Sequence, residues 1–419
     1  MILKNKNTVF LSLLALTLLI GCREESSIYD PNYEPSRPDP VISSISPASG
    51  YLAGVDSVII TGENFVNGID SMIVNFGGSP GVITAASPTQ LVVRPGTIFG
   101  EDLPVRVGVR GAINYSNPFL YTLYQPFGLY AGLTNSDAPT SPIAVDGDNN
   151  IYTIINNNGL IRYTKVSPDG TVTVDDTGYP GEGTPTNNTM RFTEYSTMLF
   201  GPDDNLYMAQ QGIRAIFTKT FGDGAREGVW AASSASAFKI RDMVFDNNGY
   251  LWAVGDGSNK IHRFDVASKS ETQFDFEGLI TAVAYYSNDN ELYVGGIIDS
   301  TQKVWKFSID GSGNIGAGEL YFDYGSKYNG TITSMILASS GELLITTGAE
   351  VANVEKPSIL RVYPDGRYEE LFPGMLKPGA FTITWRDDEF AVVGVKGLEE
   401  SSINFLNMYD RNRAGIFGF

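Results

Sequence analysis

Short runs of alternating apolar and polar residues, bounded by Gly, Asn, Asp and Pro, recur along nearly the whole chain. Such runs are typical of β-strands that place one face on a core, and the flanking residues favour the turns that end each strand. The sequence shows no apolar spacing typical of a long amphipathic helix. The pattern therefore predicts an all-β protein.

One unit is repeated six times in the second part of the chain: an apolar strand, a tight polar turn and a second apolar strand. The six second strands begin at Ile151, Leu206, Leu251, Leu292, Leu343 and Phe390, at intervals of roughly 41 to 55 residues. Intervals of this size are typical of propeller blades. We therefore predict a six-bladed β-propeller over residues 125–419.

A third strand and a fourth strand complete each predicted blade. Third strands are clear at Leu160–Tyr163, Lys260–Phe264, Val304–Phe307 and Ile359–Val362, and turns such as Ser167–Gly170 lead into fourth strands. The polar turn before a Leu-Tyr or Ile-Tyr strand resembles NHL-type propellers. Two segments could close the ring, because either Ala414–Phe419 ends the last blade in chain order or Phe127–Leu133 supplies a locking strand.

Residues 40–124 carry a different strand pattern. Apolar runs lie around Val58, Ile73–Phe76, Leu91–Val93, Val105–Val109 and Phe119–Leu123, with Gly and Pro turns between them. About seven short strands in about 85 residues is the spacing of a β-sandwich. The order of Ile42, Ile45, Pro47, Gly50, Gly54, Ile59, Gly62, Asn64, Phe65, Val74, Phe76, Gly77, Gly78, Pro118, Phe119 and Tyr121 resembles the IPT/TIG immunoglobulin-like family. That resemblance implies a spacer or interaction module.

The N-terminus has the pattern of an export signal. Lys4 and Lys6 precede an apolar run that is too short for a permanent membrane span, and Gly21 comes directly before Cys22. This order resembles a bacterial lipoprotein signal, which implies removal of residues 1–21 and lipidation of Cys22. The acidic pair after Cys22 resembles a signal for export to the outer leaflet. Prolines within residues 22–39 then predict a semi-rigid tether.

Composition narrows the partners and the chemistry. With 29 Lys and Arg against 47 Asp and Glu, the formal charge is −18, which repels phosphate backbones and argues against nucleic acid as a partner. Cys22 is the single cysteine, so the exported body has neither a disulfide nor a thiol nucleophile. The membrane is contacted through the lipid anchor alone, and the protein is expected to be monomeric.

Catalytic donors are scarce. His262 is the single histidine, which excludes a multi-histidine zinc site. A Ser-His-Asp triad would have to use His262, and no Gly-x-Ser-x-Gly elbow accompanies it. We interpret His262 as a surface or hydrogen-bonded structural histidine on a third strand. We therefore predict neither catalytic residues nor a metal or other cofactor.

Two motifs imitate binding loops. Asp146, Asp148 and Asn150 match the start of a calcium loop, but Ile151 stands where the glycine of such a loop is needed. We interpret this segment as a blade turn. Gly311, Gly313 and Gly316 have dinucleotide-loop spacing, but they join two strands and no helix follows, so they are predicted to form a hairpin loop.

Ligand binding is expected at one end of the propeller, where loops enter the innermost strands and loops join the second strands to the third. The long insertion over residues 176–195 belongs to this end. Aromatic rings beside charged groups suit a sugar, because a ring stacks on its apolar face while polar groups bind its hydroxyls. The candidate ligand-binding residues are Tyr179, Arg191, Tyr195, Arg241, Tyr324 and Tyr328.

Together these features favour a non-enzymatic lipoprotein at the outer-membrane surface, facing the cell exterior and binding an extracellular glycan or a surface protein complex. The layout resembles the surface glycan-binding lipoproteins of polysaccharide-uptake systems. Two alternatives stay open. One is a metal-dependent propeller lactonase or lyase, for which Glu194 and Asp242 lie near the starts of innermost strands. The other blades offer Thr281, Thr333 and Thr382 there, which are weak metal ligands. The other is an adhesion or assembly module that binds a protein.

Overall fold

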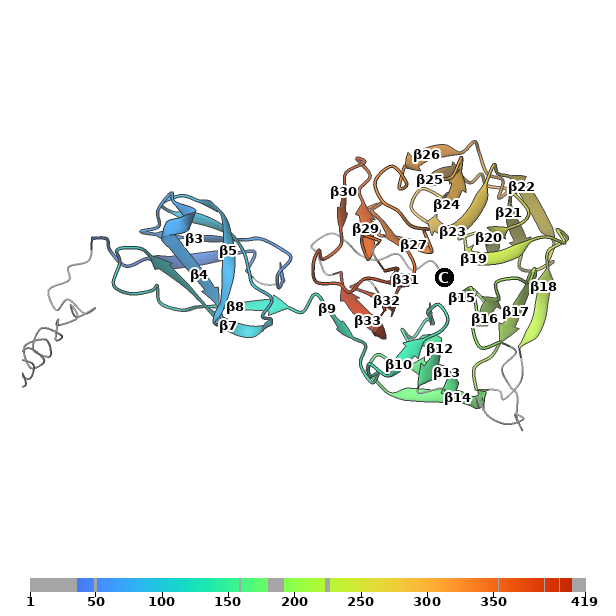
Figure 1. Cartoon of the computed structure of the whole chain (residues 1–419), viewed down its shortest axis with the longest axis horizontal. Coiled ribbons are helices and arrows are strands. Elements are labelled where there is room, and N and C mark those ends of the chain that lie inside the picture. The colour runs from blue at the N-terminus through green and yellow to red at the C-terminus, as the bar shows by residue number, and fades with distance from the viewer. Residues whose placement is uncertain are drawn as a thin grey trace, which may run out of the picture.

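The computed structural model describes residues 36–48, 51–157, 160–179, 192–222, 227–352, 354–387, 389–398 and 400–408. Within these ranges the chain is almost entirely β-structure, with a single 3-10 turn, η1 (Ile69–Ser71). A β-sandwich is followed by a six-bladed β-propeller, as the strand pattern predicts (Figure 1). None of the helices in these ranges is long and apolar enough to cross a membrane. The export signal and Cys22 lie outside the described residues.

The N-terminal sandwich contains eight strands, including all five that the apolar runs predict. Its strands are β1 (Val41–Ser46), β2 (Tyr51–Leu52), β3 (Val58–Glu63), β4 (Met72–Phe76), β5 (Ser79–Ala86), β6 (Gln90–Arg94), β7 (Gly100–Val109) and β8 (Phe119–Tyr124). The first half of β5 pairs with β4 and its second half with β6, so β5 joins the two layers. Alternating residues such as Val58, Ile60 and Val74 are fully buried in the shared core.

Six sheets surround a common hub and form the propeller (Figure 1). The strands of the first three blades are β10 (Asp137–Pro139), β11 (Ala144–Val145), β12 (Ile151–Asn157), β13 (Leu160–Val166) and β14 (Val172–Tyr179); β15 (Thr197–Phe200), β16 (Leu206–Ala209), β17 (Ala215–Lys219) and β18 (Gly228–Ala232); and β19 (Lys239–Phe245), β20 (Tyr250–Asp256), β21 (Lys260–Asp265) and β22 (Glu271–Asp275). Blade 1 differs from the other five in that both β10 and β11 pair with its second strand, β12.

Blades 4, 5 and 6 follow in chain order. Their strands are β23 (Leu279–Tyr286), β24 (Glu291–Ile298), β25 (Thr301–Ser308) and β26 (Glu319–Phe322); β27 (Ser334–Leu337), β28 (Leu343–Thr346), β29 (Ile359–Val362) and β30 (Tyr368–Glu370); and β31 (Ala380–Trp385), β32 (Phe390–Lys396) and β33 (Ser401–Asn407). Blade 6 takes its fourth strand from the other end of the propeller segment, because β9 (Phe127–Leu129) pairs with β33. Of the two closures the sequence allowed, the structure has the one that uses Phe127.

Carboxylates organise the turns between first and second strands. Asp146 Oδ1 accepts hydrogen bonds from the backbone N–H groups of Asp148 and Asn150, and its Oδ2 accepts one from the Tyr152 hydroxyl at 2.8 Å. Asp246 repeats this arrangement in blade 3, where Trp252 Nε1 is the side-chain donor at 2.9 Å. The prediction that Asp146 belongs to a blade turn is confirmed. The predicted hairpin loop at Gly311–Gly316 is also confirmed, since it joins β25 to β26.

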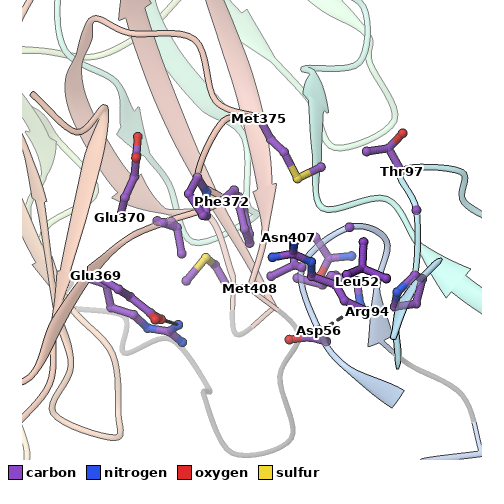
Figure 2. A pocket seen from close by; sticks show the side chains of 18 of the residues that line it. Leu52, Asp56, Arg94, Thr97, Glu369, Glu370, Phe372, Met375, Asn407 and Met408 are labelled. Atoms are coloured by element: carbon purple, nitrogen blue, oxygen red, sulfur yellow. Dashed lines mark hydrogen bonds and ion pairs between the residues drawn. The ribbon is translucent and has the colours of Figure 1, made fainter. Parts of the chain in front are cut away.

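The sandwich packs directly against blades 5 and 6. Leu52 of β2 is buried in a cluster with Leu371, Phe372 and Trp385 of the propeller. Next to this contact is a pocket of about 570 Å³, lined by Arg94 and Thr97 on the sandwich side and by Glu369, Phe372, Met375 and Asn407 on the propeller side (Figure 2). The two domains therefore share an apolar contact as well as a linker.

Candidate functional site

A pocket of about 280 Å³ lies at the hub of the propeller. All six blades contribute to its wall, so it exists only when the ring is closed. The lining residues are Thr140, Pro142, Glu194, Tyr195, Ser196, Gln210, Gln211, Arg241, Asp242, Thr281, Ile332, Thr333, Ser334, Gly348, Ala349, Phe381, Thr382 and Lys396. Most of them carry hydroxyl, amide or charged groups. The wall therefore offers many polar contacts and few apolar ones.

The lining residues come from the two classes of segment that the sequence analysis assigned to the binding end. Glu194 and Thr333 lie just before the innermost strands of their blades, and Thr140 lies between β10 and β11. Gln210 and Gly348 lie in loops between second and third strands. Innermost strands run in the same direction around the hub, so their starting ends converge at one end of the molecule. These loops surround a pocket, and whether that pocket binds a ligand stays a prediction.

Three blades deliver a side chain to the pocket through the same device, a β-bulge in the innermost strand. The strand register shifts at Arg241 in β19, at Thr281 in β23 and at Phe381 in β31, so each of these residues is left outside the regular pairing. A bulge bends the strand and redirects the side chain of the extra residue. In all three blades the bulged residue lines the pocket.

A glycine on the neighbouring second strand accompanies each bulge. Gly255 pairs with Ile240 beside the bulge at Arg241, and a Cβ atom there would lie 1.9 Å from the backbone oxygen of Lys239. Gly296 and Gly394 occupy related positions in blades 4 and 6, where a Cβ atom would come within 2.7 Å of Leu279 O and of Thr382 Cγ2, respectively. Any larger residue would push the bulged strand away from its partner.

Charged groups at the pocket are held in two different ways. Arg241 makes a two-pronged ion pair with Asp256, with its Nε 2.5 Å from Oδ1 and its Nη2 2.8 Å from Oδ2. Asp242 turns away and accepts hydrogen bonds from the Thr197 hydroxyl and from the backbone N–H groups of Met243 and Val283. Burial raises the pKa of Asp242 to about 7 despite these donors. Asp242 therefore connects blades 2, 3 and 4.

Lys396, at the end of β32, has no ion-pair partner among the residues that the structure describes. Its ammonium group lies 3.3 Å from the backbone oxygen of Thr140 and 4.3 Å from the centre of the Phe381 ring. Burial lowers the pKa of Lys396, and the nearby carboxylate of Glu194 opposes that shift. A partly buried ammonium with spare donors is well suited to bind an oxygen-rich ligand.

Tyr195 and Arg241 are the two candidate residues from the sequence that the structure brings together at the pocket. Tyr195 is largely buried, and its hydroxyl donates to Glu227 Oε1 at 2.5 Å. Its backbone N–H donates to Ser141 Oγ at 2.8 Å. Tyr195 thus forms part of the pocket wall, and its ring belongs to the apolar cluster that blades 1 and 2 share.

The other candidates lie elsewhere. Tyr324 is fully buried in the core between blades 4 and 5, and Tyr328 packs against it with ring centres 5.6 Å apart, so neither lines the hub pocket. Tyr179 is the last residue of β14, and the structure describes its backbone but not its side chain. Arg191, like Cys22, lies outside the described residues.

A metal centre was the alternative suggested by carboxylates at the starts of innermost strands. Among the described residues, no group of three or more His, Cys, Asp or Glu side chains is arranged to hold a metal ion. Glu194 and Asp242 both line the pocket, but the other strand starts there contribute Thr281, Thr333 and Thr382. Hydroxyl groups therefore take most of the positions that a carboxylate cage would need.

Sequence reasoning missed Lys396, Phe381 and the glutamines of blade 2. The sequence does contain a pattern that could have pointed to the bulged residues, including Phe381. Second strands of blades 3, 4 and 6 each contain Val-Gly, at Val254-Gly255, Val294-Gly295 and Val393-Gly394. Because glycine inside a strand often marks a bulge or a close backbone approach, the repeated pair could have located the bulged residues opposite it.

Comparison with protein families supports the division into two kinds of fold. Residues 40–122 match the IPT/TIG domain, which confirms the resemblance seen in the sequence. Residues 144–310 match a family described as a repeat of unknown function, and this segment covers most of blades 1 to 4. No curated protein matches the chain.

Several solved structures share the architecture at low sequence identity. An auxiliary nutrient binding protein from Bacteroides thetaiotaomicron is 13% identical with a TM-score of 0.51, over 90% of this chain and 99% of its own. Another protein of that organism, provisionally described as a phosphatase, is 13% identical with a TM-score of 0.56, over 90% and 98% of the two chains. A luciferin-regenerating enzyme is 11% identical with a TM-score of 0.50, over 70% and 97%.

At such identities these likenesses establish the fold alone, and the neighbours differ in what they do. The family match and the arrangement of sheets agree with each other on the architecture. The chain is an IPT/TIG domain followed by a six-bladed β-propeller.

Proposed function

We propose that this protein is a lipid-anchored surface protein that binds a saccharide in the hub pocket of its propeller. The observation that carries this proposal is the pocket wall, to which all six blades supply hydroxyl, amide or charged groups and blade 6 also supplies the Phe381 ring. Sugars present many hydroxyl groups and an apolar ring face, and such a wall can satisfy both. A structural neighbour described as an auxiliary nutrient binding protein agrees with a binding role.

Lipidation at Cys22 would complete the role. An anchor holds captured polymer close to the membrane, so that modest affinity at one site is sufficient to raise its local concentration. The tether over residues 22–39 and the sandwich would then hold the propeller away from the lipid. Metabolic labelling with an alkyne fatty acid tests this part: label should enter the wild type and be absent from Cys22→Ala.

The binding proposal is tested by affinity electrophoresis of the folded protein in gels that contain starch, xylan, pectin or mucin. At least one polysaccharide should retard the wild type. Lys396→Met should weaken that retardation by roughly tenfold or more in dissociation constant, because hydrogen bonds to a charged donor contribute about 1.5–3 kcal/mol. Lys306→Met is the matched control, since Lys306 pairs with Glu291 outside the pocket lining.

Two results would count against the proposal. One is free migration of the wild type in every gel and on a broad glycan array. The other is equal retardation of wild type and Lys396→Met, which would place the saccharide outside the hub pocket.

A further inference from the structure

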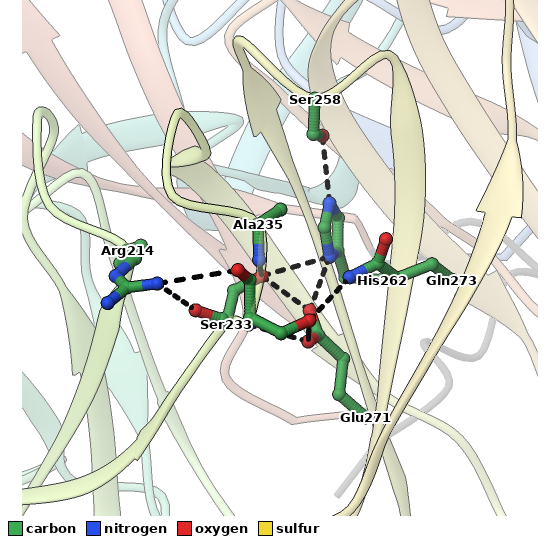
Figure 3. A network of polar contacts seen from close by, with 8 residues as sticks. Arg214, Ser233, Ala235, Ser258, His262, Glu271 and Gln273 are labelled. Carbon is green, nitrogen blue, oxygen red and sulfur yellow. Dashed lines mark hydrogen bonds and ion pairs between the residues drawn. The ribbon is translucent and has the colours of Figure 1, made fainter.

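His262 lies in a chain of hydrogen bonds in blade 3 (Figure 3). It is not among the residues that line the hub pocket. Its Nδ1 is 2.6 Å from Glu271 Oε1, and its Nε2 is 2.8 Å from the hydroxyl oxygen of Ser258. The ring is fully buried and stacks on Phe238, with ring centres 3.7 Å apart and planes 13° apart. Serine, histidine and carboxylate are thus arranged in line, with the histidine held rigidly between the other two.

The carboxylate of Glu271 sets the direction of these hydrogen bonds. Glu271 also accepts from the Ser233 hydroxyl, from the Ser234 hydroxyl at 2.6 Å and from the Ser234 backbone N–H at 2.7 Å. Burial raises the pKa of Glu271, but these donors together outweigh it and bring the pKa to about 2, so Glu271 is an anion that can only accept. His262 must therefore carry its proton on Nδ1, which leaves the Nε2 lone pair to accept from Ser258.

His262 is also in the protonation state that a base requires. Burial lowers its pKa, against the opposing influence of Glu271, so the ring is neutral at physiological pH. Lys260 lowers the pKa further, while its own ammonium group pairs with Asp275. A neutral imidazole next to a serine hydroxyl can remove the hydroxyl proton when the oxygen attacks.

Ser258 itself is partly exposed. It lies in the loop between β20 and β21 and is flanked by Gly257 (φ 81°) and Asn259 (φ 52°). Asp256, directly before this loop, pairs with Arg241, which places Ser258 at the pocket-bearing end of the propeller.

We infer that Ser258, His262 and Glu271 form a hydrolytic triad that acts on acyl esters. Ser258 Oγ attacks the ester carbonyl carbon while its proton passes to His262 Nε2. The bond to the alcohol oxygen then breaks, the alcohol takes that proton, and the acyl group stays on Ser258. Water attacks the acyl carbon, gives a proton to Nε2, and the acid leaves as Ser258 regains its hydroxyl proton. This activity does not depend on saccharide binding at the hub.

Covalent labelling of the full-length folded protein tests the triad. Diisopropyl fluorophosphate should form a phosphoryl–serine bond at Ser258 with loss of fluoride, and peptide mass spectrometry should locate the adduct. The protein should also hydrolyse p-nitrophenyl acetate, and Ser258→Ala should abolish both reactions. Glu271→Gln and His262→Gln should slow labelling by roughly 10²- to 10⁴-fold, the usual contribution of a general base.

Ser300→Ala is the matched control, because Ser300 occupies the corresponding loop of blade 4, between β24 and β25, where no histidine is present. In the Ser300→Ala variant, the rate at which Ser258 is labelled should stay within about twofold of the wild-type rate. Should His262→Gln fail to fold, Glu271→Asp takes its place, since it keeps the charge but lengthens the contact to Nδ1. Absence of an adduct on folded wild type, or equal labelling of Ser258 in the Glu271 variants, would overturn the inference.

Discussion

His262 is buried as a neutral ring, and this makes the stability of the protein sensitive to acid. The pKa of His262 is lower in the folded state than in the unfolded state. As pH falls below about 6.5, His262 is therefore protonated in the unfolded chain while it is still neutral in the folded chain. The free energy of unfolding should therefore fall with acidification, by at most about 1.4 kcal/mol per pH unit from this group. The stability associated with neutral His262 is therefore fully present above about pH 6.5 and decreases as the pH falls below that value.

Urea unfolding of wild type and His262→Gln at pH 7, 6 and 5 checks this prediction. His262 is the single histidine, so no other imidazole titrates in this range. The difference between the two proteins reports the titration of His262 together with any change at its partner Glu271, whose pKa of about 2 lies below the range measured. Asp242 acts in the opposite sense, because its raised pKa makes stability fall as pH rises from about 4 to about 7, but it is present in both proteins. Parallel stability curves for the two proteins would contradict the prediction.

At the residue level the sequence was a partial guide to the pocket. Arg241 and Tyr195 were identified because aromatic and charged residues near the start of an innermost strand point to a binding face. The same rule selected Tyr324, which is fully buried between two blades. A tyrosine in a blade loop has the same local sequence whether it packs inward or faces a pocket, and the neighbouring blade decides which occurs.

Among the elements, the bulged innermost strands give the sharpest prediction. Gly255→Ala would place a Cβ atom 1.9 Å from Lys239 O and 2.9 Å from Arg241 N, so the bulge could not keep its form. We expect a loss of about 1–3 kcal/mol in the free energy of unfolding, the usual cost of overpacking. Arg241 should also lose its ion pair with Asp256, and any polysaccharide retained by the wild type should be retained less.

Gly147→Ala provides the control for that experiment, because a Cβ atom there would meet no atom within 4 Å. Chemical denaturation of both variants, followed by tryptophan fluorescence, measures the difference. If the two substitutions have equal effects on stability, the close approach at Gly255 does not constrain the bulge.

Individual strands were predictable because each carries its own alternation of apolar and polar residues. All six pairs of first and second strands lie where the repeat places them. Ring closure was not predictable, since Phe127–Leu133 and Ala414–Phe419 both read as short strands. The pairing of Leu129 with Asn404 is a contact between distant parts of the chain. Local sequence patterns cannot predict such a contact.

At the level of the whole molecule, the sandwich and the propeller are joined by a buried contact. The local sequence pattern does not predict this contact. Leu52 is only 3% exposed, because it packs among residues of blades 5 and 6. Gly54 lies close to Met375, since a Cβ atom added to Gly54 would be 3.3 Å from the Met375 sulfur. The linker between the domains is short, since β8 ends at Tyr124 and β9 begins at Phe127. Together these features should fix the orientation of the propeller on its sandwich.

Leu52→Asp tests this coupling, because a carboxylate cannot stay in an apolar contact without a partner. The side chain should leave the cluster of Leu371 and Phe372, the domains should then move independently, and small-angle scattering should show a larger radius of gyration. Calorimetry should resolve separate unfolding transitions for the two domains. Leu120→Asp applies the same change to an exposed position of the sandwich, 59% exposed on β8, and should alter neither measurement. If Leu52→Asp matches that control, the short linker alone sets the orientation and the buried contact does not contribute to it.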